Sequence, residues 1–438
     1  MRRLFSRASC SIAAVTPQRL HYSSSSSAAP TTEAPVPLIS GAPNRLVRNS
    51  SDTIMTCTDF VGSSGAGNQM SPQRLAGGEM LGLMDTTAAG VALHHLTGKR
   101  FQLGVPAQTL PNADGTFSAT AGGAVSCATI GVDNTCFVAP VLHGDLVDVS
   151  GRVVHAGSSS IGVFIQAHRL PFLSSERTLV AEAFFSMVAV DSTLKAAKVV
   201  PAVALHTAEE RALHARYAEI RDAQTKNNAY FHSLEGADRN AHIADINAFV
   251  EENSSVHHHH GGSSSASSFA PLLARVPVSH TVTEANRHFN TAHLNINNTI
   301  FGGEILRWME SHATYCGRKF ARNRHVYSIG MHSVSFNHPI FPTDWVSLRA
   351  RVALTRKATI EVDVRLTVER EGSPVMTNRA SFVLMNTDEV GRKCRLTTGI
   401  SIEGEDDRVV RHVAMAKHRF LHQKRVYDLM KHHHNKEV

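Results

Sequence analysis

Two segments of the chain carry apolar residues at helical spacing directly after a Gly-Gly pair. In the first, apolar positions recur every three or four residues over 80–95, and the pattern ends at Gly98. In the second, they recur over 305–316, and the pattern ends at Gly317. Both segments are apolar around most of the helix, which is typical of buried helices. We therefore predict two buried helices, each opened by glycines and ended by another glycine.

After the second helix, apolar and polar residues alternate with period two. Such stretches lie at 346–354, 359–368 and 381–385, with turn sequences at Pro342-Thr-Asp and Glu371-Gly. A long buried helix followed by strands of this kind predicts an α+β architecture, in which an antiparallel sheet wraps around the helix.

The chain contains this arrangement twice. Residues 75–85 (LAGGEMLGLMD) read like 300–310 (IFGGEILRWME), and 140–153 align without gaps to 339–352. The offset is 225 positions at the glycines and 199 at the strands, so the first copy has 225 − 199 = 26 extra residues. They fall within 99–124, which we interpret as a loop insertion. Two copies of one domain predict a built-in heterodimer.

Composition and the repeat divide the chain into five parts. Between the copies, Leu213, Tyr217 and Ile220 fall at helical spacing in charged sequence, which predicts one or two exposed connecting helices. The basic tail reads as a helix packed on the domain rather than one on an anionic membrane. The expected parts are a transit peptide and disordered segment (1–50), the first domain (52–205), a helical and low-complexity linker (206–270), the second domain (271–400) and the tail (401–438).

The N-terminus is rich in arginine and serine and has no acidic residue before Glu33. This composition is typical of a mitochondrial transit peptide, so we expect a location in the mitochondrial matrix. An unstructured tail with chance arginines is the alternative. No apolar run reaches the roughly 18 residues that a membrane-crossing helix needs, so no transmembrane segment is expected.

Charge and cysteine content narrow the possible partners. The formal net charge is 44 − 37 = +7, but the basic residues form no evident recognition motif, so no nucleic acid is expected. Phosphate-bearing small molecules are the milder interpretation. The six cysteines show no C-x-x-C pair, which argues against a disulfide framework or a zinc site. The histidine runs at 257–260 and 432–434 read as low-complexity sequence rather than metal ligands.

The Gly-Gly pairs suggest a chemical role. Glycines at a helix start leave backbone N–H groups unobstructed, and such groups can stabilise an oxyanion; the alternative is that they only permit close packing. Asp85 lies eight residues along its helix, roughly 12 Å from the start, so it can face only the glycines of the other repeat. The alternative for Asp85 is a polar residue at an exposed helix edge.

Duplication would create two composite sites. One would combine Asn295, Gly302 and Gly303 of the second repeat with Asp85 of the first. The other would combine Met70, Gly77 and Gly78 with Glu310. The first site has a carboxylate and an amide that can hold a water molecule, whereas the second has an apolar residue in place of the amide. Only the first looks complete.

Asn295 and the IFGGEILRWME segment, followed by VSFNHPI at 334–340, closely resemble the double hot-dog acyl-CoA thioesterases. The two-repeat order, charged connecting helices and presequence are most similar to the mitochondrial acyl-CoA thioesterase 9/10 group. The resemblance covers about 52–400. It implies tandem hot-dog domains that hydrolyse acyl-CoA to free fatty acid and CoA with no metal or cofactor, at a site made by an Asn of one domain and an Asp of the other. Asn295 and Asp85 match these positions.

The resemblance also implies a CoA contact at one turn and leaves a second site open. The turn residues are Thr355, Arg356, Lys357 and Thr359, with a solvated hairpin as the alternative. Some single hot-dog enzymes use Glu in the Asp position, so a weaker site at Glu310 remains possible. Hot-dog pairs tend to stack, which implies a homo-oligomer, a trimer or dimer of double hot dogs.

Other functions remain as alternatives to the thioesterase. A non-catalytic acyl-CoA-binding or assembly protein would bind CoA without turnover. A hot-dog hydratase is disfavoured by the Asn295 and Asp85 pattern, and an RNA-associated protein is suggested only by the charge. Whether Asp85 activates water or attacks the thioester directly is not decided by the sequence.

Overall fold

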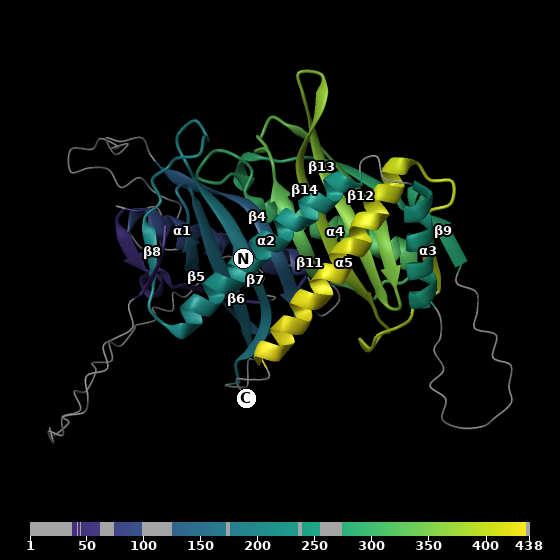
Figure 1. Cartoon of the computed structure of the whole chain (residues 1–438), viewed down its shortest axis with the longest axis horizontal. Helices are drawn as coiled ribbons and strands as arrows, with labels where there is room; N and C mark the ends of the chain where they lie inside the picture. The colour runs from purple at the N-terminus through teal and green to yellow at the C-terminus, as the bar shows by residue number, and fades with distance from the viewer. Residues whose placement is uncertain are drawn as a thin grey trace, which may run out of the picture. The chain divides into compact units, whose positions relative to one another are not determined.

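Ten antiparallel strands form one continuous sheet in the computed structural model (Figure 1). The structure describes residues 37–61 apart from 42 and 44, 74–98, 125–171, 176–234, 239–254 and 274–434. The strand order is β10-β12-β13-β14-β11-β4-β7-β6-β5-β3. The two halves meet where β4 (Ser126–Phe137) pairs with β11 (Val326–Phe336), so the sheet itself joins the two repeats.

Each half contains the same elements in the same order, which confirms the predicted duplication. The first half consists of β3 (Met55–Phe60), α1 (Gly77–Thr97), β4, β5 (Leu146–Ala156), β6 (Ser160–Leu170) and β7 (Thr178–Val190). The second consists of β10 (Thr283–His288), α4 (Gly302–Ala321), β11, β12 (Trp345–Arg356), β13 (Thr359–Arg370) and β14 (Ser373–Asn386). One long helix lies against five strands in each half, which is the expected tandem hot-dog architecture.

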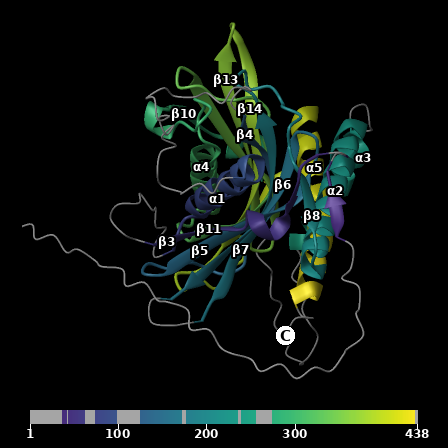
Figure 2. The same ribbon diagram turned by 90° about the vertical axis from the view of Figure 1, so that its left-hand side faces the viewer.

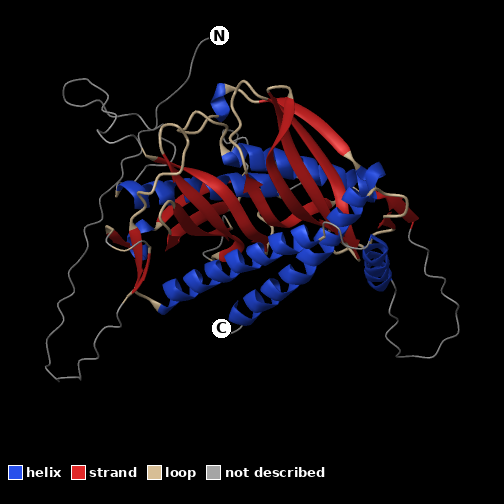
Figure 3. Cartoon of the chain, turned by 45° about the horizontal axis from the view of Figure 1, so that its top comes forward, coloured by secondary structure: helices blue, strands red, loops and turns tan. Residues whose placement is uncertain are grey.

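Helices lie on both faces of the sheet. Figure 2 shows α1 and α4 on one side, and α2 (Ala208–Ser233), α3 (Arg239–Ser254) and α5 (Asp407–His434) on the other. Figure 3 shows the strands between these two sets of helices. Successive residues of strands such as β5 and β12 therefore face helices on opposite sides of the sheet. Among the described helices, none is long and apolar enough to span a membrane.

The turn before β5 and the equivalent turn before β12 have the same hydrogen bonds. The carboxylate of Asp145 accepts the amide of Leu142 at 2.8 Å, and that of Asp344 accepts the amide of Phe341 at 2.8 Å. An arginine donates to the proline carbonyl of each turn, Arg169 to Pro140 at 2.9 Å and Arg370 to Pro339 at 2.6 Å. The gap-free alignment of these segments thus reflects one conserved turn geometry within the chain.

The two central helices end differently from each other. The first ends as predicted, with Gly98 in the left-handed conformation at φ 72°. The second does not end at Gly317 but continues to Ala321, with Arg322 left-handed at φ 50°. A Cβ on Gly317 would clash with the side chain of Leu384, so this glycine serves packing against β14 rather than helix termination.

The linker and tail are more tightly packed than the sequence suggested. Two connecting helices are present, but α2 is not simply exposed, because Leu213, Tyr217 and Ile220 are buried against Phe164 and Phe184 of the first half. The tail forms α5, which packs on the second half as expected. Its buried residues include Val409, Val410, Val413, Ala414 and Met415.

Short strands correct the expected boundaries of the two domains. Residues 38–50 were expected to be disordered, yet β1 (Leu38–Ser40) and β2 (Val47–Asn49) pair with β8 (Ala202–Leu205). Likewise, β9 (Ala274–Pro277) pairs with β15 (Thr398–Ser401). Short 3-10 turns complete the described elements at Ser50–Thr53, Val278–Thr281 and Thr291–His293. The predicted transit peptide, the 99–124 insertion, Met70 and the 257–260 histidines lie outside the described residues.

Candidate active site

The central helices α1 and α4 cross at their glycines. A Cβ on Gly78 would lie 2.8 Å from the Cα of Arg307, and one on Gly303 would lie 3.1 Å from the Cα of Gly82. Backbone atoms cannot move aside as a flexible side chain can, so the second glycine of each pair is needed for the crossing. Close packing of the two helices therefore requires glycine at Gly78 and Gly303.

The first glycine of each pair faces a carboxylate of the other repeat. A Cβ on Gly302 would lie 2.9 Å from Asp85 Oδ2, and one on Gly77 would lie 3.3 Å from Glu310 Oε1. The prediction that Asp85 reaches the glycines of the opposite repeat is thus confirmed. Each carboxylate lies about two turns along its own helix. Because the two helices cross closely, it reaches the start of the other helix.

Asp85 is 1% exposed and is held on one side by a strand of its own repeat. The hydroxyl of Thr129 on β4 donates to Asp85 Oδ1 at 2.7 Å. The other oxygen, Oδ2, makes no hydrogen bond of full geometry with a described residue, although the amide of Gly303 points at the carboxylate closely enough to affect its titration. One carboxylate oxygen is therefore fixed, and the other remains available to a water molecule or a substrate atom.

Burial raises the pKa of Asp85 to about 6. The Thr129 hydroxyl, the Gly303 amide and the positive charge of Arg307 act in the opposite direction, because each favours the ionised carboxylate. A carboxylate with such a pKa is ionised at neutral pH and still takes up a proton readily, as a general base must.

Asn295 is engaged in its own turn. Its Oδ1 accepts the amides of Asn297 at 2.8 Å and Thr299 at 3.2 Å, and its Nδ2 donates to Thr299 Oγ1 at 2.9 Å. The turn is tied to the first repeat by Asn297, which hydrogen-bonds Ser126 and the carbonyl of Cys127 on β4. Asn295 therefore makes no hydrogen bond to Asp85, and one N–H of its amide remains for another partner.

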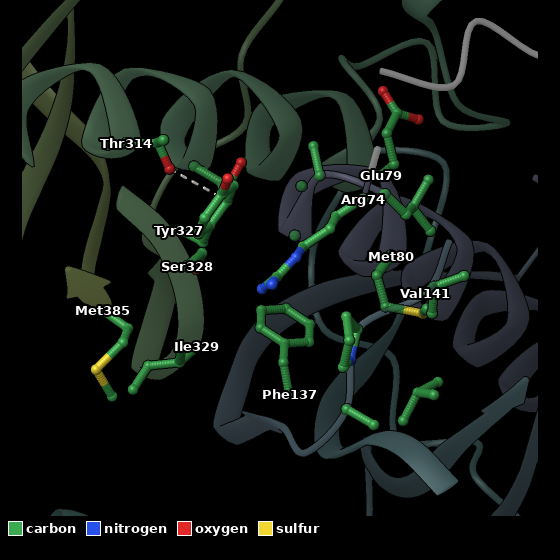
Figure 4. A pocket seen from close by; sticks show the side chains of 18 of the residues that line it. Arg74, Glu79, Met80, Phe137, Val141, Thr314, Tyr327, Ser328, Ile329 and Met385 are labelled. Carbon is green, nitrogen blue, oxygen red and sulfur yellow. Dashed lines mark hydrogen bonds between the residues drawn. The ribbon is translucent and has the colours of Figure 1, made fainter. Parts of the chain in front are cut away.

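The second composite site adjoins a cavity of about 420 Å³, here called the Glu310 pocket. Figure 4 shows Tyr327, Ser328 and Ile329 of β11 on one side of it, and Arg74 and Phe137 of the first repeat on the other. Glu310 itself is 4% exposed, and Thr314 of the same helix donates to its Oε1 at 3.0 Å. Burial raises the pKa of Glu310, while Thr314 and the amide of Gly78 lower it.

The predicted CoA-binding turn joins β12 and β13 but does not line the Glu310 pocket. Thr355 is buried and accepts the amide of Ile400 at 3.4 Å, and the Thr359 hydroxyl donates to the carbonyl of Arg356. The guanidinium of Arg356 lies 4.3 Å from the ring centroid of Phe420 on α5, which leaves only Lys357 exposed in the turn. A CoA contact there stays a prediction.

Three polar residues of the sites were missed in the sequence, although the repeat offsets could have found them. Thr129 and Ser328 are equivalent at the strand offset of 199, and each lies beside the carboxylate of one site. Arg307 is equivalent to Gly82 at the helix offset of 225, and its guanidinium fills the space where a side chain on Gly82 would lie. It pairs there with Glu79 at 3.1 Å.

Among the described residues, no group of His, Cys, Asp and Glu side chains is arranged to hold a metal ion. The described cysteines, namely Cys57, Cys127, Cys136, Cys316 and Cys394, are not joined in disulfides.

Comparison with known proteins gives a consistent picture. The family model of the Thioesterase superfamily matches residues 73–171 and 297–375. The protein named "Uncharacterized acyl-CoA thioester hydrolase YkhA", from Bacillus subtilis (strain 168), is 32% identical over 105 residues, which are 24% of this chain and 59% of that protein. The chain thus spans 59% of the length of this curated relative.

Solved structures of thioester hydrolases are similar at low identity. One is an acyl-CoA hydrolase from Staphylococcus aureus in complex with butyryl coenzyme A, 19% identical, with a TM-score of 0.31, covering 36% of this chain and 99% of that one. Another is the 12:0-ACP thioesterase from Umbellularia californica, 9% identical, with a TM-score of 0.42, covering 76% of this chain and 95% of that one. The two stretches matched by the Thioesterase superfamily model are those that hold α1 and α4, and both halves have the hot-dog fold.

Proposed function

We propose that this protein is an acyl-CoA thioesterase that hydrolyses acyl-CoA to a free fatty acid and CoA at the composite site of Asp85. The observation that carries the proposal is the position of the Asp85 carboxylate at the start of α4, beside Gly302. The acyl-CoA thioester hydrolase among the similar proteins supports the choice of substrate. Neither repeat alone contains both the acid and the helix start it faces.

In the proposed mechanism, Asp85 acts as general base. It takes a proton from a water molecule whose oxygen attacks the thioester carbonyl carbon, and the negative charge moves to the carbonyl oxygen. The tetrahedral intermediate then collapses, the C–S bond breaks, and CoA leaves as a thiolate. Thiolate is a good leaving group, so no strong acid is needed. Direct attack by Asp85 through an anhydride is the rival route.

The residues around Asp85 have distinct roles in this mechanism. The amide of Gly303 points at the carboxylate, so the amide of Gly302 is the better donor to the oxyanion; it makes no hydrogen bond with another described residue. Thr129 fixes the carboxylate on the opposite side. The free N–H of the Asn295 amide would orient the water molecule or the carbonyl.

Release of free thiol from acyl-CoAs of short to long chain tests the proposal. We expect Asp85→Asn to abolish turnover and Glu310→Gln, the matched change in the other repeat, to spare it. Activity lost only in Glu310→Gln would move the catalytic site to the other repeat. CoA binding without turnover of any acyl-CoA would replace the enzyme by the non-catalytic binding protein.

Location and assembly are separate parts of the proposal. The Arg- and Ser-rich N-terminus supports import into the mitochondrial matrix, and protease-protected uptake of the full chain, but not of residues 37–438, by isolated mitochondria is expected. A homo-oligomer of double hot dogs, a trimer or a dimer, is expected from the tendency of hot-dog pairs to stack. Light scattering of the purified chain would measure it, and a monomeric mass would contradict it.

A further inference from the structure

Cations outnumber carboxylates in the lining of the Glu310 pocket, with Arg74, Arg307, Arg318 and Lys393 against Glu79 and Glu310. Arg74 and Lys393 both line it, and neither forms a salt bridge with a described residue. Arg74 lies with its guanidinium carbon 4.7 Å from the ring centroid of Tyr327, and the loop at Gly391 leaves no room for a side chain beside it. Arg74 is thus held at the pocket by packing on Tyr327 rather than by an ion pair with a carboxylate. Its positive charge therefore remains available to an anion.

The interior of the pocket differs from the Asp85 site in how its acid is held. At the Asp85 site, Thr129 of the strand fixes the carboxylate. At the equivalent position, the Oγ of Ser328 is buried without a hydrogen-bond partner in the described structure, and Glu310 is instead bound by Thr314 one turn along its own helix. The catalytic arrangement is therefore incomplete here, yet a polar atom lining the pocket is left without a partner.

The pocket has the size and chemistry of a small-molecule site. Its volume of about 420 Å³ falls within the roughly 300–1,000 Å³ of typical ligand pockets. Phe137, Met80 and Ile329 give it apolar walls, and Arg74 and Lys393 are among its other lining residues. Arginine and lysine together are the side chains that recognise phosphate groups, and an apolar wall suits the organic part of the same ligand.

We propose that the Glu310 pocket is a second ligand site, which binds the phosphate-bearing nucleotide of coenzyme A without hydrolysing a thioester. Arg74 and Lys393 would contact the phosphates, and the hydroxyl of Ser328 would receive a polar group of the ligand arm. The choice of coenzyme A rests on the proposed function, whereas the cationic pocket itself does not. Each chain would then bind two CoA molecules, one at the Asp85 site and one here.

Native mass spectrometry and calorimetry of the full chain carrying Asp85→Asn would count the bound ligands. The probes are free CoA, a non-hydrolysable thioether analogue of acyl-CoA, and adenosine 3′,5′-bisphosphate. We expect two CoA molecules per chain. The double variant Arg74→Ala/Lys393→Ala should weaken one of the two by roughly a hundredfold or more, since each lost charge-assisted contact is worth about tenfold or more. Binding of adenosine 3′,5′-bisphosphate should fall in the same way.

The matched control is Arg349→Ala, which removes an exposed arginine on β12 that does not line the pocket. It should leave both ligands bound. A single CoA per chain in the parent, or two equally tight CoA molecules in the double variant, would overturn the proposal. Thiol release that persists in Asp85→Asn and disappears when Arg74 and Lys393 are also replaced would make the pocket catalytic and overturn it as well. Two CoA molecules with no hydrolysis by the wild type would reject the proposed function and leave the pocket as a binding site.

Discussion

At the scale of single residues, the titration of Asp85 should set the pH dependence of the hydrolysis rate. Its pKa is raised to about 6 by burial, and the carboxylate is a base only when it has lost its proton. The rate should therefore rise with pH through about 6, and at pH 5 about one tenth of the sites are ionised. We expect kcat/KM for acyl-CoA to be about tenfold lower at pH 5 than on its plateau. A rate that stays constant from pH 5 to pH 8 would exclude Asp85 as the titrating base.

Thr129 should set the position of that pH profile. Its hydroxyl donates to Asp85 Oδ1 and favours the ionised carboxylate. Thr129→Val keeps the shape but removes the donor, so the pKa of Asp85 should rise and the acid limb should move to higher pH by about one pH unit or more. The pH dependence of kcat/KM measures this directly. Ser328→Ala is the matched control, because it removes the equivalent hydroxyl beside Glu310 and should leave the profile where it was.

The sequence predicted part of this site because duplication is visible in it. The eight-residue spacing from Gly77 to Asp85 excludes contact within one repeat, so the pairing of Asp85 with Gly302 could be inferred without coordinates. Thr129 was missed because the 99–124 insertion changes the offset between the repeats from 225 to 199, although the strand offset does pair it with Ser328. The turn that engages Asn295 depends on the conformation of 295–299, which residue type alone does not determine.

At the scale of elements, the crossing of α1 and α4 controls both sites at once. Gly→Ala inside a helix is by itself stabilising by roughly 1 kcal/mol. A Cβ on Gly78, however, would lie 2.8 Å from the backbone of Arg307, so Gly78→Ala must push the helices apart. We expect a net loss of about 1–3 kcal/mol in the free energy of unfolding and a fall in kcat. Urea unfolding and thiol release measure the two effects.

Lys319→Ala is the control for this change, because Lys319 is an exposed residue of α4 that does not line the Glu310 pocket. It should keep the wild-type unfolding midpoint and rate. If Gly78→Ala raised the stability instead, the close approach of the two helices would not be rigid, and the glycine would have no packing role.

The peripheral helices show what a periodic pattern can and cannot predict. The spacing of Leu213, Tyr217 and Ile220 correctly indicated one apolar face of a helix, but it contains no information on which surface covers that face. In the fold the partner is Phe164 and Phe184, more than 25 residues away in sequence. Similarly, α5 was expected as a packed helix, whereas the ion pair of Arg419 with buried Glu361 depends on tertiary contacts.

At the scale of the whole molecule, we expect that the chain can be divided into its two repeats, but that the two repeats are active only together. The residues between α2 and α3, 235–238, fall outside the described residues. Most of α2 packs on the first half and α3 packs on α5, although Tyr230 near the end of α2 also stacks on His418 of α5. Tyr217 of α2 contacts Ser186 of the first half at 3.1 Å, whereas Lys417 of α5 pairs with Asp245 of α3. A cut at this point therefore leaves each half of the sheet with its own covering helices.

Fragments 37–236 and 237–438 should each be inactive alone and regain thiol release when coexpressed. The reason is that Asp85 lies in one fragment and Gly302 in the other, while β4 and β11 supply the pairing edge that rejoins them. The composite site also predicts which variant fragments can complement each other. The second fragment carrying Glu310→Gln should still complement the wild-type first fragment, but the first fragment carrying Asp85→Asn should not complement any second fragment. Hydrolysis by the second fragment alone, whose homodimer would pair Gly302 with Glu310, would show that Asp85 is dispensable and that one repeat contains all the catalytic residues.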